Sequence, residues 1–335
     1  MLKLKNQILK QGVMKAISRN IYKLPRCFRK FIIPLELHHL PRVFYIEPTN
    51  HCNLRCIMCP QARSSREKGY MEFPLFQKIV KEVPDNSFIH LFMGGESLLH
   101  PKIIEMIRYI KEVKPATQCR IATNGTLLDE NMSKKIILSG LDFISFSFDG
   151  PDKETYEKIR RGANYEKVLQ NIINFLRLKQ ELKSKKPYVS LEIIRMKHTE
   201  GNINKFIQKF ANLPVDEILV KKFLSWGGLI DTTTKKRQFC IAPWANMTIL
   251  WDGSVVPCCV DYDKRYLIGN VRESSLFELF NNDKMKFLRK SILDNQFEKI
   301  KLCRNCYGDI EAMYNAYEKR LSKNDLVRMR KRNNT

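Results

Sequence analysis

The sequence predicts an α/β fold in which parallel strands form an open sheet or a partial barrel, followed by a smaller cysteine-rich region. Two observations predict it. First, short apolar runs alternate six times with longer segments whose apolar residues recur at i, i+3, i+4 and i+7. Second, from Cys240 onward the pattern changes to short, turn-rich pieces. Six strand–helix repeats over about 180 residues favour parallel strands joined by right-handed crossovers.

The expected strands are the six apolar runs. They span residues 43–49, 88–95, 119–125, 143–150, 189–194 and 217–223. The expected helices are amphipathic segments between these runs, and they include residues 74–83, 101–113, 129–140 and 164–182. In folds of this kind, functional residues gather on the loops that follow the strands.

Composition divides the chain into four regions. They are a basic amphipathic extension (1–42), the α/β region (43–225), the cysteine-rich region (226–310) and a basic helix or tail (311–335). A linker-like stretch with two adjacent glycines and three consecutive threonines separates the second region from the third.

The chain is strongly basic, because 59 Lys and Arg residues stand against 35 Asp and Glu residues, a net charge of +24. Such a charge usually indicates polyanionic partners such as nucleic acid, an anionic membrane or phosphorylated substrates. The two ends, residues 1–43 and 319–335, supply 15 of these charges. A nucleic-acid-binding face would instead interleave basic and aromatic side chains, so nucleic acid is disfavoured as a partner. A non-catalytic zinc or nucleic-acid-binding protein stays a remote alternative.

No stretch reaches the roughly 18 uncharged apolar residues that a membrane span needs, which excludes an integral membrane protein. The N-terminus lacks an unbroken apolar run and a cleavage site, so we expect no signal peptide and a cytoplasmic protein. Residues 2–35 alternate apolar and basic side chains, which suits a helix on the anionic inner face of a membrane. The alternative is a solvated helix packed on the protein. In a cytoplasmic chain, the ten cysteines favour metal ligands or reactive thiols over disulfides.

Three cysteines, Cys52, Cys56 and Cys59, directly follow the first expected strand. Three thiolates on one short loop can hold three irons of a cubane cluster and leave the fourth iron without a protein ligand. A closed zinc site needs four ligands. His51 is a poor fourth ligand, because a residue adjacent to Cys52 can rarely reach the same metal atom. The triplet therefore favours a cluster with one open iron.

The segment CNLRCIMC resembles the CxxxCxxC signature of the radical S-adenosylmethionine (SAM) enzymes, and residues 240–306 are similar to their C-terminal SPASM or twitch domain. The resemblance covers residues 44–307. It implies a partial (β/α)6, TIM-like barrel whose 4Fe-4S cluster binds SAM at the open iron. One electron, supplied by a flavodoxin- or ferredoxin-like donor, then cleaves SAM to methionine and a 5′-deoxyadenosyl radical. That radical removes a hydrogen atom from the substrate.

The resemblance also implies which side chains contact SAM. The matching positions are Met58, Gly94, Gly95, Glu96, Thr123, Asn124, Ser147, Asp149 and Arg160. The two glycines would let the backbone approach the methionyl amine, and Glu96 would accept its hydrogen bond. Arg160 resembles the arginine that pairs with the SAM carboxylate. Met58 would meet the adenine or fill the core.

A second set of cysteines follows the linker: Cys240, Cys258, Cys303 and Cys306. Four thiolates from separate loops form a closed site, which by count suits zinc or a fully ligated 4Fe-4S cluster. The resemblance to SPASM domains favours the auxiliary cluster. Residues 307–335 contain no cysteine, so one auxiliary cluster is expected rather than two. Cys259 competes with Cys258, which the spacing from Gly253 favours.

Combined, these features predict a radical SAM oxidoreductase. The auxiliary cluster would accept the electron that a substrate radical releases, which suits dehydrogenation of a sugar, cyclitol or glycan alcohol. Asp261 is the candidate general base, and Glu192 and Arg195 are candidates to face substrate or SAM. The basic N-terminus suits a lipid-linked or phosphorylated glycan substrate. The alternative is a maturase that modifies a ribosomally made peptide or protein.

Overall fold

The computed structural model describes residues 29–30, 32–230, 239–306 and 317–333. A single ten-stranded sheet runs through them in the order β10-β6-β5-β4-β3-β2-β1-β7-β8-β9. Its six central strands are β1 (Val43–Ile46), β2 (Phe88–His90), β3 (Gln118–Thr123), β4 (Phe143–Ser147), β5 (Tyr188–Arg195) and β6 (Glu217–Lys222). They are neighbours in chain order and all pair in parallel. The predicted α/β class with parallel strands is confirmed.

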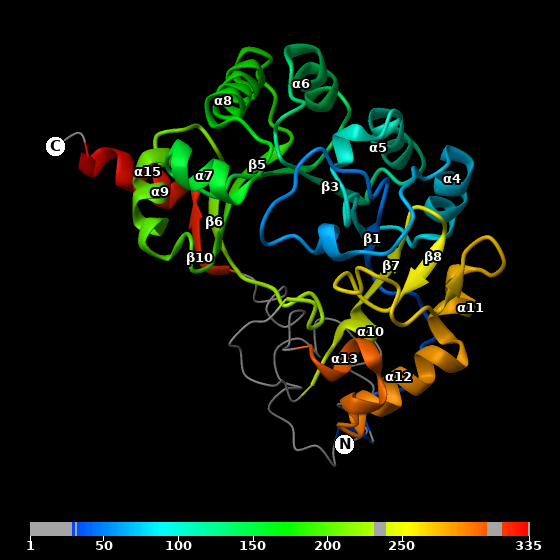
Figure 1. Cartoon of the computed structure of the whole chain (residues 1–335). Coiled ribbons are helices and arrows are strands. Elements are labelled where there is room, and N and C mark those ends of the chain that lie inside the picture. Colours follow the sequence, from blue (N-terminus) through cyan, green and yellow to red (C-terminus); the bar gives the residue numbers. More distant parts are fainter. Residues whose placement is uncertain (1–28, 31, 231–238, 307–316, 334–335) are drawn as a thin grey trace.

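Helices follow the strands and cover one face of the sheet, as Figure 1 shows. They are α4 (Phe73–Glu82), α5 (Ile103–Val113), α6 (Glu130–Ile137), α7 (Lys153–Ile159), α8 (Tyr165–Glu181) and α9 (Ile203–Phe210). Asp129, Asp152 and Asn164 begin α6, α7 and α8 as N-caps, each side chain accepting a backbone N–H in the first turn. The apolar stripe of each helix then faces the strands.

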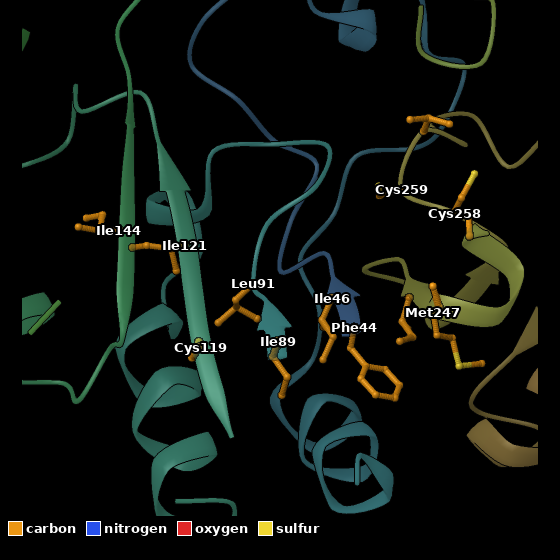
Figure 2. Close-up of a cluster of buried hydrophobic side chains, with 14 of the residues drawn as sticks. Phe44, Ile46, Ile89, Leu91, Cys119, Ile121, Ile144, Met247, Cys258 and Cys259 are labelled. Atoms are coloured by element: carbon orange, nitrogen blue, oxygen red, sulfur yellow. The ribbon is translucent and has the colours of Figure 1, made fainter. Parts of the chain in front are cut away.

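The two faces of the sheet differ in burial. Side chains that point toward the helices, such as Phe44, Ile89 and Ile121, are fully buried and form the core seen in Figure 2. The lone Cys119 belongs to this core. On the other, inner face, His90 and Arg120 are half-buried, whereas Ser145 and Glu192 are buried. The inner face is therefore polar and only partly accessible.

The cysteine-rich region continues the same sheet. Its elements are α10 (Ala242–Ala245), β7 (Asn246–Ile249), β8 (Ser254–Val256), β9 (Gly269–Asn270), α11 (Leu276–Asn281), α12 (Asp283–Leu293) and α13 (Lys301–Arg304), with short 3-10 helix η5 at Phe297–Lys299. Strand β7 pairs in parallel with β1, and β8 and β9 add as antiparallel strands. This pairing places the second cysteine set beside the first strand of the barrel.

The two ends of the chain pack on different parts of the molecule. At the N-terminal side, Trp244 Nε1 donates to the Pro34 carbonyl (2.8 Å) and Arg289 Nη1 to the Leu35 carbonyl (2.7 Å). Residues 1–28, where most of the proposed membrane helix lies, are outside the described residues. No helix in the described part of the chain is long and apolar enough to cross a bilayer.

At the C-terminal side, the structure corrects the expected helix or tail. A helix is present, α15 (Lys323–Asn333), but β10 (Tyr317–Ser322) precedes it and pairs antiparallel with β6. The segment reads YEKRLS, so apolar and polar residues do not alternate along it. Its sequence alone therefore does not indicate a strand. Hydrogen bonding to the edge of β6 decides its conformation.

Candidate active site

The first three cysteines lie on the loop after β1. Two backbone hydrogen bonds hold this loop against the segment after α7: Arg55 N–H to the Arg161 carbonyl (2.9 Å) and Ile57 N–H to the Ile159 carbonyl (3.0 Å). The Cys59 N–H closes a turn on the Cys56 carbonyl (3.1 Å). All three thiols remain half-buried, so the loop presents them at an accessible surface.

The electrostatics of these thiols depend on burial and on one arginine. Burial raises the pKa of Cys52 to about 11 and also raises the pKa of Cys56 and of Cys59. At Cys56 the nearby Arg160 charge opposes the rise. Because iron binds thiolates, loading this loop releases protons.

The Gly-Gly-Glu motif lies directly against the cysteine loop. A Cβ on Gly95 would come within 2.4 Å of the His51 carbonyl oxygen and 2.5 Å of the Thr49 carbonyl oxygen. The next residue, Glu96, donates its N–H to the His51 carbonyl (2.8 Å). Glycine is thus required here for close contact between two loops, a role that the motif alone did not reveal. Contact with the SAM amine stays a prediction.

Glu96 joins the ends of two strands. Its carboxylate accepts the backbone N–H of Asn124 (2.7 Å), just after β3, and that of Leu98 (3.1 Å). Asn124 in turn donates from Nδ2 to Oδ1 of Asn53 in the cysteine loop (2.9 Å). Burial raises the pKa of Glu96, against the hydrogen bonds from Asn124 and Thr123. The structure therefore brings the predicted residues of β2, β3 and the cysteine loop together.

Arg160 contacts both β4 and the cysteine loop. Its Nε and Nη2 donate to Asp149 Oδ2 (2.9 and 2.5 Å), and Nη1 lies 3.9 Å from the Cys56 sulfur. The other oxygen of Asp149 accepts the N–H of Ile194 (2.7 Å). Both members of the ion pair are buried. Asp149 thus occupies two of the guanidinium donors that the sequence analysis assigned to the SAM carboxylate, and that assignment stays a prediction.

The remaining predicted SAM contacts lie around the same loop. Met58 is buried in a small apolar cluster with Ile159 and Met196, separate from the main core. Ser147 is half-buried at the end of β4. Their roles toward SAM stay predictions, but their positions after β1 and β4 place them on the loop side of the sheet.

The second cysteine set lines one buried pocket. Its walls contain Cys240, Cys258, Cys303 and Cys306, together with apolar side chains from α10, α12 and α13. Cys259 is buried but is not part of this lining. Burial raises the pKa of Cys258 well above its usual range, and the charges of Cys259, Asp261 and Cys240 add to the effect. Four cysteines thus line one apolar pocket, which is the ligand number of a fully ligated 4Fe-4S cluster.

A buried ion pair that the sequence analysis missed connects the two regions. Glu47, directly after β1, accepts both Arg66 donors (2.8 and 2.7 Å), and the N–H groups of Gly94 (3.1 Å) and Trp251 (3.3 Å). Tyr262, four residues after Cys258, packs under the Arg66 guanidinium (5.4 Å to the ring centroid) and donates its hydroxyl to the Gly94 carbonyl. The only sequence signal was an acidic residue at a strand end.

Asp261, the predicted general base, is fully buried in a turn. Its two oxygens accept the backbone N–H groups of Arg265 (2.9 Å) and Tyr266 (3.0 Å). Burial raises its pKa, and these two bonds oppose the rise. The structure gives Asp261 a role in shaping the turn after the second cysteine set, while its role as a base stays a prediction.

The inner face of the sheet carries a charged network. Glu192 on β5 accepts from Arg120 on β3 (2.5 Å) and from Lys221 on β6 (3.1 Å). Although burial favours its neutral form, Lys221 and Arg120 lower the pKa of Glu192. Burial, together with the charges of Arg120 and Lys221, lowers the pKa of His90 well below its usual value. Arg195 pairs with Glu200 at the surface instead (2.7 Å).

Two protein families match the parts of the chain that carry these residues. Residues 46–210 match the Radical SAM superfamily, and residues 240–307 match SPASM, an iron-sulfur cluster-binding domain. The chain is a radical SAM enzyme with a C-terminal SPASM domain. Its cofactors are therefore SAM and 4Fe-4S clusters, and both cysteine sets have the ligand numbers that these clusters need.

Among curated relatives of this radical SAM enzyme is the tungsten-containing aldehyde ferredoxin oxidoreductase cofactor-modifying protein of Pyrococcus furiosus. It is 27% identical over 301 residues, which are 74% of this chain and 83% of that protein. The SAM-dependent 2-deoxy-scyllo-inosamine dehydrogenase of Niallia circulans is 24% identical over 274 residues, which are 78% of this chain and 90% of that protein.

Solved structures show the same fold. BtrN in complex with AdoMet and 2-DOIA matches 81% of this chain and 94% of its own, with a TM-score of 0.57 and 19% identity. Streptococcus suis SuiB bound to its precursor peptide SuiA matches 80% of this chain and 71% of its own, with a TM-score of 0.63 and 14% identity. At these identities, the likeness concerns the fold alone.

Proposed function

We propose that this radical SAM enzyme dehydrogenates an alcohol carbon of a sugar, cyclitol or glycan. Cys52, Cys56 and Cys59 would hold the SAM-binding cluster, which supplies the hydrogen-abstracting radical when loaded and reduced. Cys240, Cys258, Cys303 and Cys306 would hold the auxiliary cluster as electron acceptor. The observation behind this proposal is the buried four-cysteine pocket, whose downstream residue Tyr262 contacts the SAM motif at Gly94.

The proposed reaction balances as a two-electron oxidation. Removal of one hydrogen atom from the carbinol carbon leaves a carbon radical. That radical loses one electron to the auxiliary cluster and its hydroxyl loses one proton, which gives a carbonyl. A closed, fully ligated site suits this role, because no iron is free to bind another ligand. The similarity to a SAM-dependent cyclitol-type dehydrogenase supports the same reaction.

The inner face of the sheet supports a polar substrate. Arg120, Glu192 and Lys221 form a chain of charge-assisted contacts on this face, and Lys221 is its most exposed member, with side-chain exposures of 15%, 5% and 35%. Ser145 joins them, since Arg120 Nε donates to its hydroxyl (2.9 Å). Such a network contains the donors and acceptors that a ligand with several hydroxyl groups would need. The same network would also accept a phosphorylated glycan through its two cations.

The second candidate is a maturase that modifies a peptide or a protein-bound cofactor. Its support is the 27% identity to a cofactor-modifying protein and the shared fold with SuiB, which was crystallised with a precursor peptide. Both candidates require the same two clusters, so only the product distinguishes them.

Product analysis tests the proposal. Anaerobically reconstituted, reduced protein is incubated with SAM and with panels of aminocyclitols, sugar phosphates and lipid-linked glycans, and with synthetic peptides as the competing class. We expect an alcohol substrate to lose two hydrogen atoms, with one 5′-deoxyadenosine formed per carbonyl. Deuterium at the carbinol carbon should appear in 5′-deoxyadenosine. A cross-linked peptide without any oxidised alcohol would overturn the proposal.

A separate part of the proposal is that the basic N-terminal segment contacts the inner face of the membrane, where lipid-linked substrates would lie. The contacts of Pro34 and Leu35 with the cysteine-rich region show that a truncated chain should keep these residues. We therefore compare flotation on phosphatidylglycerol vesicles of the full chain and of a chain that begins at Arg29. Loss of vesicle binding on truncation is expected, and equal recovery would contradict the membrane contact.

A further inference from the structure

The pocket of the second cysteine set lies directly beneath the surface formed by α12, η5 and α13. Leu288 and Ile292 of α12 line the pocket, as do Leu302 and Cys303 of α13. Helix α13 is a single turn, so the residues next to its cysteine point outward. Lys301, Arg304 and Asn305 are all exposed beside the buried Cys303 and Cys306. Exposed side chains of α13 thus lie next to residues that line the pocket.

The outer side of these elements is basic. Its exposed basic residues are Lys284, Lys290, Lys299, Lys301 and Arg304, and we call them, with the exposed Phe287, the basic face. Within residues 283–306, the exposed acids are Asp283 and Glu298. Lys290 pairs with Asp294 (2.7 Å), whereas Lys299 and Lys301 form no ion pair with any described residue. The face therefore combines positive charge with one large exposed aromatic ring.

The distribution of exposed charged and apolar residues on this face favours a protein partner over a membrane. A membrane-bound helix needs a continuous apolar stripe, but the exposed positions of α12 are polar or charged apart from Phe287, which is 49% exposed. An exposed aromatic residue on a helix that also carries exposed basic side chains is typical of a protein contact that charge steers. Its partner should carry an acidic surface.

We propose that the basic face is the docking site of an acidic one-electron carrier protein of the flavodoxin or ferredoxin type. The carrier takes up the electron that the auxiliary cluster has received. The balance is one electron: the reduced auxiliary cluster returns to its oxidised state and the oxidised carrier is reduced by one electron, with no proton or group transferred. The direction of transfer rests on the proposed function, whereas docking at this face does not.

Charge reversal tests the docking site. The variant is Lys299→Glu/Lys301→Glu/Arg304→Glu, and the matched control is Lys134→Glu/Lys135→Glu/Lys158→Glu, which changes the same charge at exposed positions of α6 and α7. Both changes are made in a protein that also bears Cys52→Ala, Cys56→Ala and Cys59→Ala, so that only the auxiliary cluster exchanges electrons. Stopped-flow absorbance follows oxidation of the dithionite-reduced cluster by oxidised flavodoxin at low salt.

We expect the basic-face variant to react at least tenfold more slowly with flavodoxin, and the control variant to react like its parent. Oxidation by a small uncharged quinone should be the same in all three proteins. Equal rates with flavodoxin, or equal slowing in both variants, would overturn the docking site. The docking site would also be overturned if the basic-face variant lost binding to phosphatidylglycerol vesicles while its rate of reaction with flavodoxin stayed unchanged.

A second measurement covers the case in which the basic-face variant loses its iron. Carbodiimide cross-linking of the unaltered protein to flavodoxin, followed by peptide mass mapping, should join flavodoxin acids to Lys299 or Lys301. Cross-links confined to other lysines would contradict the proposal. Because no substrate is present in these experiments, they can succeed even if the enzyme proves to be a maturase, and a confirmed dehydrogenase can still fail them.

Discussion

The two cysteine sets use the same ligand atom in opposite surroundings. Cys52, Cys56 and Cys59 lie half-buried on a loop held by backbone hydrogen bonds and by the contact with Gly95. The four cysteines of the second set are at most 7% exposed and line an apolar pocket. The first set has one ligand too few and remains accessible, whereas the second is complete and enclosed. Under the proposed function, ligand number and access, rather than the thiol itself, would distinguish the site that binds SAM from the site that only transfers electrons.

The largest expected effect separates the two sets directly. Replacing Cys52, Cys56 and Cys59 together by Ala should lower the iron content from about eight to about four per chain and abolish SAM cleavage. Iron analysis and chromatography of 5′-deoxyadenosine measure both. If this variant lost nearly all of its iron, the second set could not be an independent cluster site.

The second prediction concerns which of two adjacent cysteines belongs to the closed pocket. Cys258→Ser should lose the auxiliary cluster, and with it the oxidised product, while SAM cleavage continues. Cys259→Ser is the matched control, because Cys259 is equally buried but outside the pocket lining, and it should keep about eight irons. The opposite result would exchange the roles of the two residues.

The third prediction concerns the packing that shapes the open site. Gly95→Ala places a methyl group within 2.4 Å of the His51 carbonyl oxygen, so the cysteine loop must move. We expect a loss of about 1–3 kcal/mol in unfolding free energy and poor loading of the first cluster. Gly201→Ala is the control, since no atom lies within 4 Å of the added carbon. Equal denaturation midpoints and iron contents for both variants would refute the packing role.

Both cysteine sets were predictable from the sequence because ligand spacing is a local property. The alternation of apolar runs likewise predicted all six central strands, since burial of one face repeats along each strand. Glu47, Arg66 and Tyr262 could not be predicted, because their contacts join residues up to 204 positions apart. Strand β10 was missed for the same reason, as its conformation depends on the edge of β6. Local patterns thus predicted the ligands, and only the fold revealed what connects the segments that carry them.

The fourth prediction concerns the midpoint potential of the cluster at the first cysteine set. Arg160 directs Nη1 toward the Cys56 sulfur (3.9 Å), and a positive donor beside a cluster ligand stabilises the reduced, more negative cluster. Arg160→Gln should therefore make the midpoint potential of the first cluster more negative, measured by an EPR-monitored redox titration. Arg161→Gln, at the exposed neighbouring position, should leave the potential unchanged. Equal midpoint potentials in the unaltered protein and in both variants would show that Arg160 does not tune the cluster. Its position would then be explained by its ion pair with Asp149 alone.

The smallest expected effect concerns the contact that joins the two sets. Tyr262 donates its hydroxyl to the Gly94 carbonyl, so Tyr262→Phe removes one buried hydrogen bond and loosens the Gly-Gly-Glu loop. A loss of about 1 kcal/mol corresponds to an about fivefold weaker affinity for SAM, with both clusters retained. Tyr266→Phe is the matched control, because that hydroxyl donates to the Lys284 carbonyl (2.9 Å) instead. Equilibrium binding of SAM to the reconstituted proteins measures the difference. Unchanged affinity in Tyr262→Phe would mean that the cysteine-rich region supports the Gly-Gly-Glu motif only through Glu47, which accepts the N–H groups of both Trp251 and Gly94.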